Sequence, residues 1–291
     1  MISVNQGCLR ADAESRFCGS GERYSMNVIK YDLFPGANHR CITMSYDDGR
    51  DFDIRLAQIF RENGLKGTFH LNSARFDKPG VVKTEELKEI YAGHEVSCHM
   101  VTHPFPTDNP DISVLEEIIE DRKVIEAACG YVVRGMSYPY GNYDQRVINL
   151  CRAAGMEYSR TTKATNNFAL PEDFLAWHPT CHHKHNVMEK LEAFYTPNKY
   201  NRLQLLYVWG HSYEFNNDNN WELIEEFAKA AGNREDTWYA TNIEIVDYVN
   251  ALRALRVSAD RTMVYNPSAI EVWFTINGQA ASVKPGQTFV L

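Results

Sequence analysis

The feature that most constrains this chain is a regular alternation of two kinds of segment, which begins at Arg40. Short runs rich in apolar and β-prone residues, such as CITMSY at 41–46, alternate with longer runs such as 53–64, in which apolar residues recur three and four positions apart. Strands that alternate with helices form a parallel sheet, because each helix returns the chain to the same end of the sheet. The alternation therefore predicts an α/β fold.

The number of repeats narrows the architecture. Six or seven strand–helix units favour a barrel, or a distorted barrel of about seven strands, over an open sheet. We expect the helix at 113–130 to be capped by Ser113, with Glu116 at the capping-box position. Further strands are predicted at 66–72, 94–99, 132–141, 156–162 and 203–211, and further helices at 84–93, 144–155, 187–195, 220–232 and 242–255.

The two ends of the chain differ from this pattern. Residues 1–25 mix Gly, Ser and charged residues without periodicity and are expected to form a loosely held arm. The repeating units occupy 26–257. Residues 258–291 contain an Asn-Gly pair between β-rich runs, which predicts a small β-hairpin appendage on the barrel.

Composition limits the partners and the compartment. The formal net charge is −8, with no block of lysines or arginines, which argues against a nucleic-acid or anionic-membrane partner. The seven cysteines form no CxxC pair, and no run has the length of a transmembrane segment or the form of a secretion signal. We therefore expect a cytoplasmic protein with reduced thiols, and the oligomeric state stays open.

Two adjacent acids, Asp47 and Asp48, stand where the first buried strand ends. Buried carboxylates are costly unless they are paired or bound to metal. Neighbouring side chains on a strand point in different directions, so one aspartate can bind a metal ion while the other stays free as a base.

Other residues able to do chemistry also follow predicted strands. These strand ends meet at the edge where α/β proteins build active sites. The residues are Asp47 and Asp48, His99 and His103, the segment 138–141, Arg160 and His211.

His99 and His103 have an H-x3-H spacing that binds one ion only if the chain turns between them. On a regular strand the two residues would lie about 13 Å apart. Pro104 and the loop-like residues after it indicate a turn. Two imidazoles and one carboxylate then make a facial site for zinc or another divalent transition ion, with open positions for water and substrate.

The motifs SYDDG, HMVTH, YPYG and YVWGH have the order and approximate spacing found in the polysaccharide deacetylases, the NodB-homology or carbohydrate esterase family 4 group. The resemblance covers roughly residues 40–250. It implies a distorted (β/α) barrel and one divalent ion, with zinc expected and cobalt, nickel, iron or manganese as alternatives.

The resemblance also implies roles for individual residues. Asp47 resembles the general base and Asp48 the metal-ligating aspartate, while His99 and His103 resemble the two histidine ligands. The backbone N–H of Tyr140 would help to hold the oxyanion, and His211 would protonate the leaving amine.

Two motifs depart from the family pattern. The family's arginine before the P-x-Y-G turn, which orients the base, is replaced by Ser137, so Arg134 or Arg160 is expected to take its place. The family's Asp-Trp motif, which tunes the acidic histidine, has no clear counterpart, because Asp173 and Trp177 lack its spacing.

Several residues are weaker candidates. Tyr138, Trp177, His182 and Trp209 could line a sugar site, with core packing as the alternative for the tryptophans. A second ion is a less favoured reading of the histidine-rich segment 177–185, and Glu214 is expected to face solvent.

The resulting hypothesis is a hydrolase acting on a carbon–nitrogen bond: hydrolysis of the acetamide of an N-acetylated amino sugar by water activated on the metal. A cytoplasmic location would favour a mono- or oligosaccharide. One alternative is hydrolysis of another C–N bond, as in an allantoin-like or cyclic-imide substrate. A non-catalytic sugar-binding barrel is the other.

Overall fold

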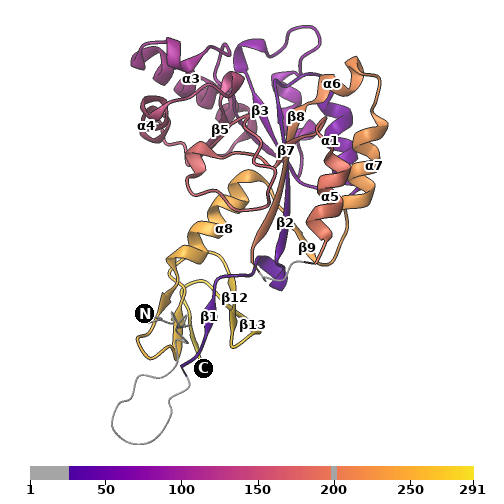
Figure 1. Ribbon diagram of the computed structural model, residues 1–291. Helices are drawn as coiled ribbons and strands as arrows, with labels where there is room; N and C mark the ends of the chain where they lie inside the picture. The colour runs from indigo at the N-terminus through magenta and orange to yellow at the C-terminus, as the bar shows by residue number, and fades with distance from the viewer. Residues whose placement is uncertain (1–25, 198–201) are drawn as a thin grey trace, which may run out of the picture.

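The computed structural model describes residues 26–197 and 202–291, and the arm expected at 1–25 lies outside them. A curled parallel sheet forms the body of the molecule (Figure 1), in the order β6-β5-β4-β3-β2-β8-β7 with β9 paired to β2. The predicted distorted barrel of about seven strands is confirmed. These strands are β2 (Arg40–Asp47), β3 (Gly67–Leu71), β4 (Glu95–Cys98), β5 (Gly135–Ser137), β6 (Tyr158–Arg160), β7 (Cys181–His182), β8 (Gln204–His211) and β9 (Thr237–Tyr239).

The register places the ends of the central strands side by side. Asp47 at the end of β2 lies opposite His70 of β3 on one side and His211 of β8 on the other. On the far side of β3, Leu71 pairs with Cys98, so that His99 follows directly at the same edge. The strand ends that carry the chemistry therefore share one edge of the sheet.

Helices follow the strands as the alternation predicts, with two differences. The segment expected as a helix at 84–93 is a 3₁₀ turn followed by the short α2. The short α6 and the strands β7 and β9 were not predicted. The helices are α1 (Asp53–Glu62), α2 (Leu87–Ile90), α3 (Asp111–Cys129), α4 (Gln145–Ala153), α5 (Val187–Tyr195), α6 (Ser212–Asn217), α7 (Glu222–Ala231) and α8 (Asn242–Ala254).

The predicted cap at Ser113 is wrong. Helix α3 begins two residues earlier, at Asp111, and follows Pro110, which contributes no side-chain cap. The extended backbone of Pro110 sets the start of the helix instead.

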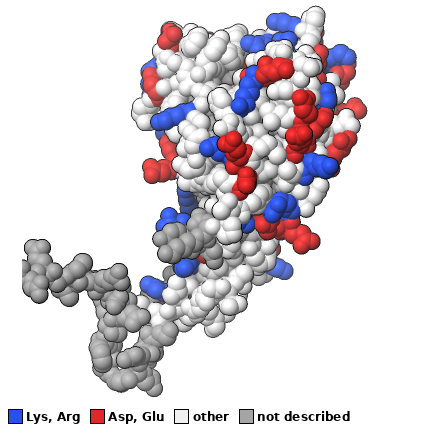
Figure 2. Space-filling model, turned by 45° about the vertical axis from the view of Figure 1, so that its right-hand side comes forward, with Lys and Arg blue, Asp and Glu red and all other residues white. Residues whose placement is uncertain are grey.

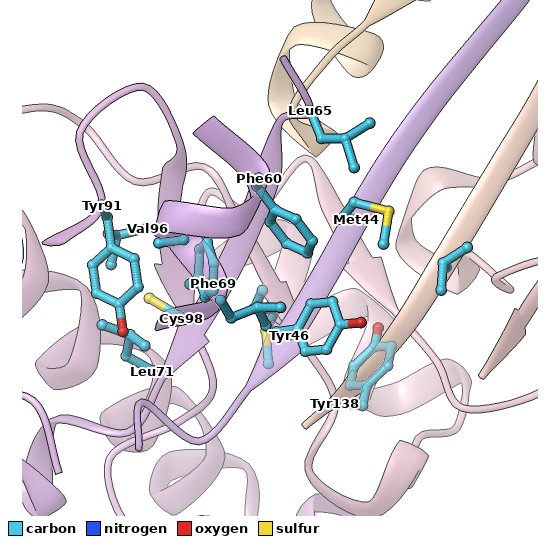
Figure 3. Packing of buried hydrophobic residues seen from close by; sticks show 14 of the residues in the cluster. Met44, Tyr46, Phe60, Leu65, Phe69, Leu71, Tyr91, Val96, Cys98 and Tyr138 are labelled. Carbon is cyan, nitrogen blue, oxygen red and sulfur yellow. The ribbon is translucent and has the colours of Figure 1, made fainter. Parts of the chain in front are cut away.

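The main core lies between the sheet and the helices that cover it. Figure 3 shows Tyr46 and Met44 of β2 close to Phe60 of α1 and Phe69 of β3, all fully buried. Each fully buried side chain of this size contributes about 1.5–3 kcal/mol of transfer free energy. This packing fixes β2, which carries Asp47, at the centre of the sheet.

The C-terminal segment forms two small antiparallel sheets below the barrel (Figure 1). Asn277 and Gly278 both have positive φ and join β12 to β13 in a two-residue turn, as the Asn-Gly pair predicts. Strand β1, from the opposite end of the chain, pairs with β12. The strands are β1 (Ile29–Lys30), β12 (Val272–Ile276) and β13 (Gln279–Val283) in one sheet, and β10 (Arg256–Val257), β11 (Met263–Tyr265) and β14 (Thr288–Val290) in the other.

The expected boundary at residue 257 stays a prediction, although β1 adds N-terminal residues to this β segment. Helix α8 connects it to the barrel: the Tyr248 hydroxyl donates to the Leu33 carbonyl and accepts from the Trp273 N–H.

The surface carries both signs of charge. On the face in Figure 2, acidic and basic side chains are interspersed over the barrel. Among the described residues, no helix combines the length and apolar character needed to cross a bilayer.

Gly135 of β5 allows the close approach of the Tyr158 ring. A Cβ at this position would lie 1.9 Å from a carbon of that ring, which cannot shift easily because its hydroxyl donates to buried Glu95. We predict that Gly135→Ala lowers the free energy of unfolding by about 1–3 kcal/mol. Urea denaturation followed by circular dichroism measures the loss.

Gly67→Ala in β3 is the matched control, because its Cβ would lie 3.2 Å from the Phe60 ring, a contact that small shifts relieve. Equal losses in the two variants would contradict the proposed clash.

Candidate active site

Asp47 is a buried carboxylate held by two partners. Arg160, at the end of β6 and itself fully buried, donates through one guanidinium nitrogen to Asp47 Oδ2. The Ser137 hydroxyl donates to Asp47 Oδ1 at 3.0 Å. Burial opposes ionisation of this carboxyl, but Arg160 and the neighbouring imidazoles hold its pKa well below the ordinary value. Asp47 is therefore an ionised group with a fixed orientation.

Ser137 also sets the orientation of His99. The Nδ1 of His99 lies 2.9 Å from the Ser137 carbonyl, which only accepts hydrogen bonds, so Nδ1 carries the proton. The Nε2 atom is then left with a free lone pair. Burial lowers the pKa of His99 and favours this neutral form, which is the form that binds metal.

Asp48, His99 and His103 come together as the predicted metal ligands. One ligand atom from each lies within 4.8 Å of those of the other two. The two histidine rings have their centroids 4.7 Å apart. The chain turns between them because Met100 and His103 adopt left-handed backbone conformations. The turn that Pro104 indicated is thus present.

These three residues fit a divalent ion. Two neutral imidazoles and a carboxylate are the donors that zinc and related ions prefer. The hydrogen bond from His99 Nδ1 to a carbonyl is the outer contact that commonly orients a metal-binding histidine. Burial also lowers the pKa of His103 to about 4, which leaves one ring nitrogen with a free lone pair for a metal ion.

The backbone around this group is strained. Asp48, Met100, His103 and Tyr140 all have φ between +58° and +80°, a region that residues other than glycine rarely occupy. Such strain persists only where the surrounding structure enforces it, and it is concentrated at functional sites.

His211 lies at the same edge of the sheet with its side chain 22% exposed. Its Nδ1 is 3.3 Å from Glu214 Oε2. Burial lowers the pKa of His211, but the hydrogen bond to Glu214 and the charges of Asp47 and Asp48 outweigh it and raise the pKa above its ordinary value. His211 is therefore suited to carry a proton at neutral pH.

Tyr140 follows Pro139 in the turn after β5, and its ring lies beside the metal ligands. The ring meets His103 edge-on at 4.4 Å between centroids and stacks on Phe105 at 3.9 Å. Both aromatic residues are about half exposed. The assignment of the Tyr140 backbone N–H to an oxyanion stays a prediction.

Arg134 is excluded as the residue that orients Asp47. It immediately precedes β5, at the opposite end of the strand from Ser137, and it forms ion pairs with Glu157 and Asp247. Arg160 makes the contact with Asp47 instead, so of the two arginines considered only this one is placed to orient Asp47.

Two of the aromatic candidates for the sugar site are buried, and their proposed role is wrong. Trp177 is 1% exposed and packs against Tyr158 and Tyr207. Tyr138 is 0% exposed, and its hydroxyl donates to the Leu175 carbonyl.

The other two candidates lie closer to the site. The Arg160 guanidinium covers the Trp209 ring at 4.4 Å, and His182 lies against the same ring. A role for either residue in binding substrate stays a prediction.

Three positions around the candidate site were missed or misjudged. Glu214 does not face solvent: it is 17% exposed and lies among His182, His183 and His211. The spacing H-x-x-E at the start of a helix could have indicated this contact. Arg75 donates to Asp48 Oδ1 at 3.1 Å, and Ser137 joins Asp47 to His99; neither contact had a signal in the sequence.

Arg160 offsets a buried charge, whereas Arg134 makes half-exposed ion pairs. We predict that Arg160→Gln lowers the free energy of unfolding at pH 7 by about 3–5 kcal/mol. The matched change Arg134→Gln should cost about 1 kcal/mol or less. Urea denaturation of both variants measures the difference.

The loss in Arg160→Gln should shrink as the pH falls. Without the guanidinium the pKa of buried Asp47 rises, so the carboxylate of the variant is protonated at a higher pH than that of the wild type. Protonation removes the unpaired buried charge, and the difference in the free energy of unfolding therefore decreases. A loss that is independent of pH would contradict the pairing of these two charges.

Comparison with known proteins relates part of the chain to one family. Residues 35–159 match the polysaccharide deacetylase family model. A peptidoglycan N-acetylglucosamine deacetylase of Listeria monocytogenes is 28% identical over 43% of this chain and 27% of its own length. Chitin deacetylase 1 of Cryptococcus neoformans is 30% identical over 39% of this chain and 24% of its own length. The chain thus spans about a quarter of these curated relatives.

A solved structure supports the fold. The Xyl-CE4 domain of a multidomain xylanase from the hindgut metagenome of Trinervitermes trinervoides aligns over 73% of this chain and 92% of its own, with a TM-score of 0.50 and 16% identity. Asp47, Asp48, His99, His103 and the turn Tyr138-Pro139-Tyr140-Gly141 all lie within residues 35–159, the part of the chain that is similar to the polysaccharide deacetylases.

Proposed function

We propose that this protein hydrolyses the acetamide of an N-acetylated amino sugar, using one divalent ion held by Asp48, His99 and His103. The observation that carries the proposal is that an oriented carboxylate, three side chains that could hold a metal ion and a histidine suited to carry a proton lie at one edge of the sheet. Each component that amide hydrolysis requires has a residue in this site.

The divalent ion would lower the pKa of water towards about 7 and polarise the acetyl carbonyl. Asp47 lies beside the ligand group, with its Oδ2 3.8 Å from His99 Nε2, and accepts the proton from the attacking water. Because Arg160 lowers its pKa, Asp47 is a weak base, and proton transfer depends on a water made acidic at this site.

His211 would deliver a proton to the departing nitrogen. The carboxylate of Glu214 on Nδ1 stabilises the imidazolium form, which leaves Nε2–H as the acid. The Tyr140 N–H would donate to the oxyanion, a contribution of about 3 kcal/mol for a well-placed donor.

The aromatic pair Phe105 and Tyr140 supports a saccharide substrate. Both rings are about half exposed, 45% and 55%, and lie next to His103. The apolar face of a pyranose ring packs on such surfaces, and an exposed platform accommodates sugar units on either side of the reacting one. We therefore infer an oligosaccharide or a longer chain, and we propose zinc as the ion.

The contact between Arg160 and Asp47 also weakens the non-catalytic reading, whose only support was the missing family arginine. Release of acetate, in contrast to ammonia or a ureide, would distinguish deacetylation from hydrolysis of another C–N bond.

Substitution of each of the two neighbouring aspartates distinguishes the proposed base from the proposed metal ligand. We predict that Asp47→Asn lowers kcat by about 10²–10⁴-fold, as expected for loss of a general base, and leaves the metal content unchanged. Asp48→Asn should lose the metal and the activity together. Acetate release from chito-oligosaccharides and elemental analysis measure the two effects.

Asp51→Asn, an exposed position in the loop after β2, controls for the loss of one carboxylate. If Asp47→Asn lost activity only in proportion to its metal, the separate role of the base would be refuted.

Glu214 controls the protonation of His211. We predict that Glu214→Gln lowers the pKa of His211, so that kcat/KM, which falls as the pH rises through this pKa, begins to fall at a lower pH than in the wild type. A pH profile measured with one equivalent of metal tests this. An unchanged alkaline limb would show that Glu214 does not tune the acid.

A further inference from the structure

A second group of metal-binding side chains lies beside the first, in the part of the sheet formed by β7 and β8. His182, His211 and Glu214 each offer one ligand atom, and these atoms lie within 4.8 Å of one another. None of the three belongs to the group of Asp48, His99 and His103.

The contacts converge on a single oxygen. His182 Nε2, His183 Nε2 and His211 Nδ1 lie 3.0, 3.5 and 3.3 Å from Glu214 Oε2. The backbone N–H of His211 donates to the same oxygen at 3.1 Å. A carboxylate oxygen has two lone-pair sites, so four nitrogens cannot all be satisfied by it.

His183 is the residue left unsatisfied. It is 1% exposed, and neither ring nitrogen has a hydrogen-bond partner in the described structure. Its ring is stacked between Tyr46 and Phe215, which hold it in place. A buried polar group without a partner costs about 1–3 kcal/mol, so a ligand that takes up its lone pair would remove this cost.

The fold makes room for this imidazole. Strands β7 and β8 pair so that His182 lies opposite Trp209, and the backbone N–H of His183 donates to the Trp209 carbonyl. A Cβ on the next residue, Gly210, would lie 2.0 Å from His183 Nδ1. Glycine in the sequence WGH is therefore required for His183 to reach Glu214.

The spacing suits a metal ion. A tetrahedral zinc site with bonds of about 2.0–2.1 Å places its ligand atoms about 3.3–3.4 Å apart. The three distances to Glu214 Oε2 bracket this value. Lys184 does not block the oxygen, since its ammonium lies 3.3 Å from the other one, Oε1, and 2.6 Å from Asp218.

We propose that His182, His211 and Glu214 form a second divalent-cation site, with His183 as the adjoining fourth donor. The site takes a borderline ion such as zinc, because imidazoles dominate its donor set.

The second site shares His211 with the proposed catalysis. A cation on Nδ1 replaces the proton that Glu214 accepts, so His211 cannot then serve as the acid. Occupation of the second site is therefore inhibitory, and activity should rise with the first equivalent of zinc and fall with the second. This consequence depends on the proposed function, whereas the binding of the ion does not.

Zinc titration of the metal-free protein against a chromophoric chelator tests the site. We expect two ions per chain in the wild type and one in each of Glu214→Gln and His182→Asn. Asp48→Asn should also bind one, and Asp48→Asn/Glu214→Gln should bind none. Asp218→Asn, which removes the other carboxylate bound by Lys184, is the matched control and should retain two.

Retention of two ions by both Glu214→Gln and His182→Asn would overturn the proposal. So would a wild type that binds one ion and loses it in Asp48→Asn. A single ion that survives Asp48→Asn and is lost in Glu214→Gln would support the second site and refute the metal centre of the proposed function. The two proposals can therefore fail separately.

Discussion

The site depends on one contact, between Asp47 of β2 and Arg160 of β6. An isolated carboxylate buried at the end of a central strand is strongly disfavoured, and the guanidinium offsets that cost. The same contact keeps Asp47 ionised. The side chain of Asp48 does not take part in it and lies towards the histidines. The two neighbouring acids thus have different surroundings, with Asp47 against Arg160 and Asp48 beside His103.

That contact requires the sheet to curl. Strands β6 and β2 are separated by β5, β4 and β3, which in a flat sheet would place them about 19 Å apart at about 4.8 Å per strand. An arginine side chain cannot span this distance. Curvature brings Arg160 and Ser137 over the end of β2, so the contacts of Asp47 require the distorted barrel. Large buried side chains such as Tyr46 and Phe69 hold β2 in place beneath.

Much of the fold and of the candidate site could be predicted from the sequence. Alternating segments predict a parallel sheet, whose register then places Asp47, His99 and His211 at one edge whatever the details of packing. Choosing between Arg134 and Arg160 needed the structure, because the sequence does not fix where β5 begins. Arg134 precedes that strand, at the end opposite Ser137, whereas the curvature of the sheet brings Arg160 to Asp47. The burial of Tyr138 and Trp177 was also inaccessible, since an aromatic residue near a strand end can face either side.

Glu214 shows a different limit. Its position after His211 was compatible with a helix surface, but α6 begins at Ser212 and turns the carboxylate back over the strand. A helix as short as α6 and a strand as short as β7 have too few residues for a periodic pattern. They nevertheless place His182, His183 and Glu214 together.

X-ray diffraction from zinc-replete crystals, recorded on both sides of the zinc absorption edge, tests the central claim most directly. The account predicts an anomalous peak bonded to Asp48, His99 and His103, with Asp47 outside the coordination sphere and held by Arg160. A zinc ion bonded to Asp47, or an Arg160 side chain turned away from it, would contradict the account.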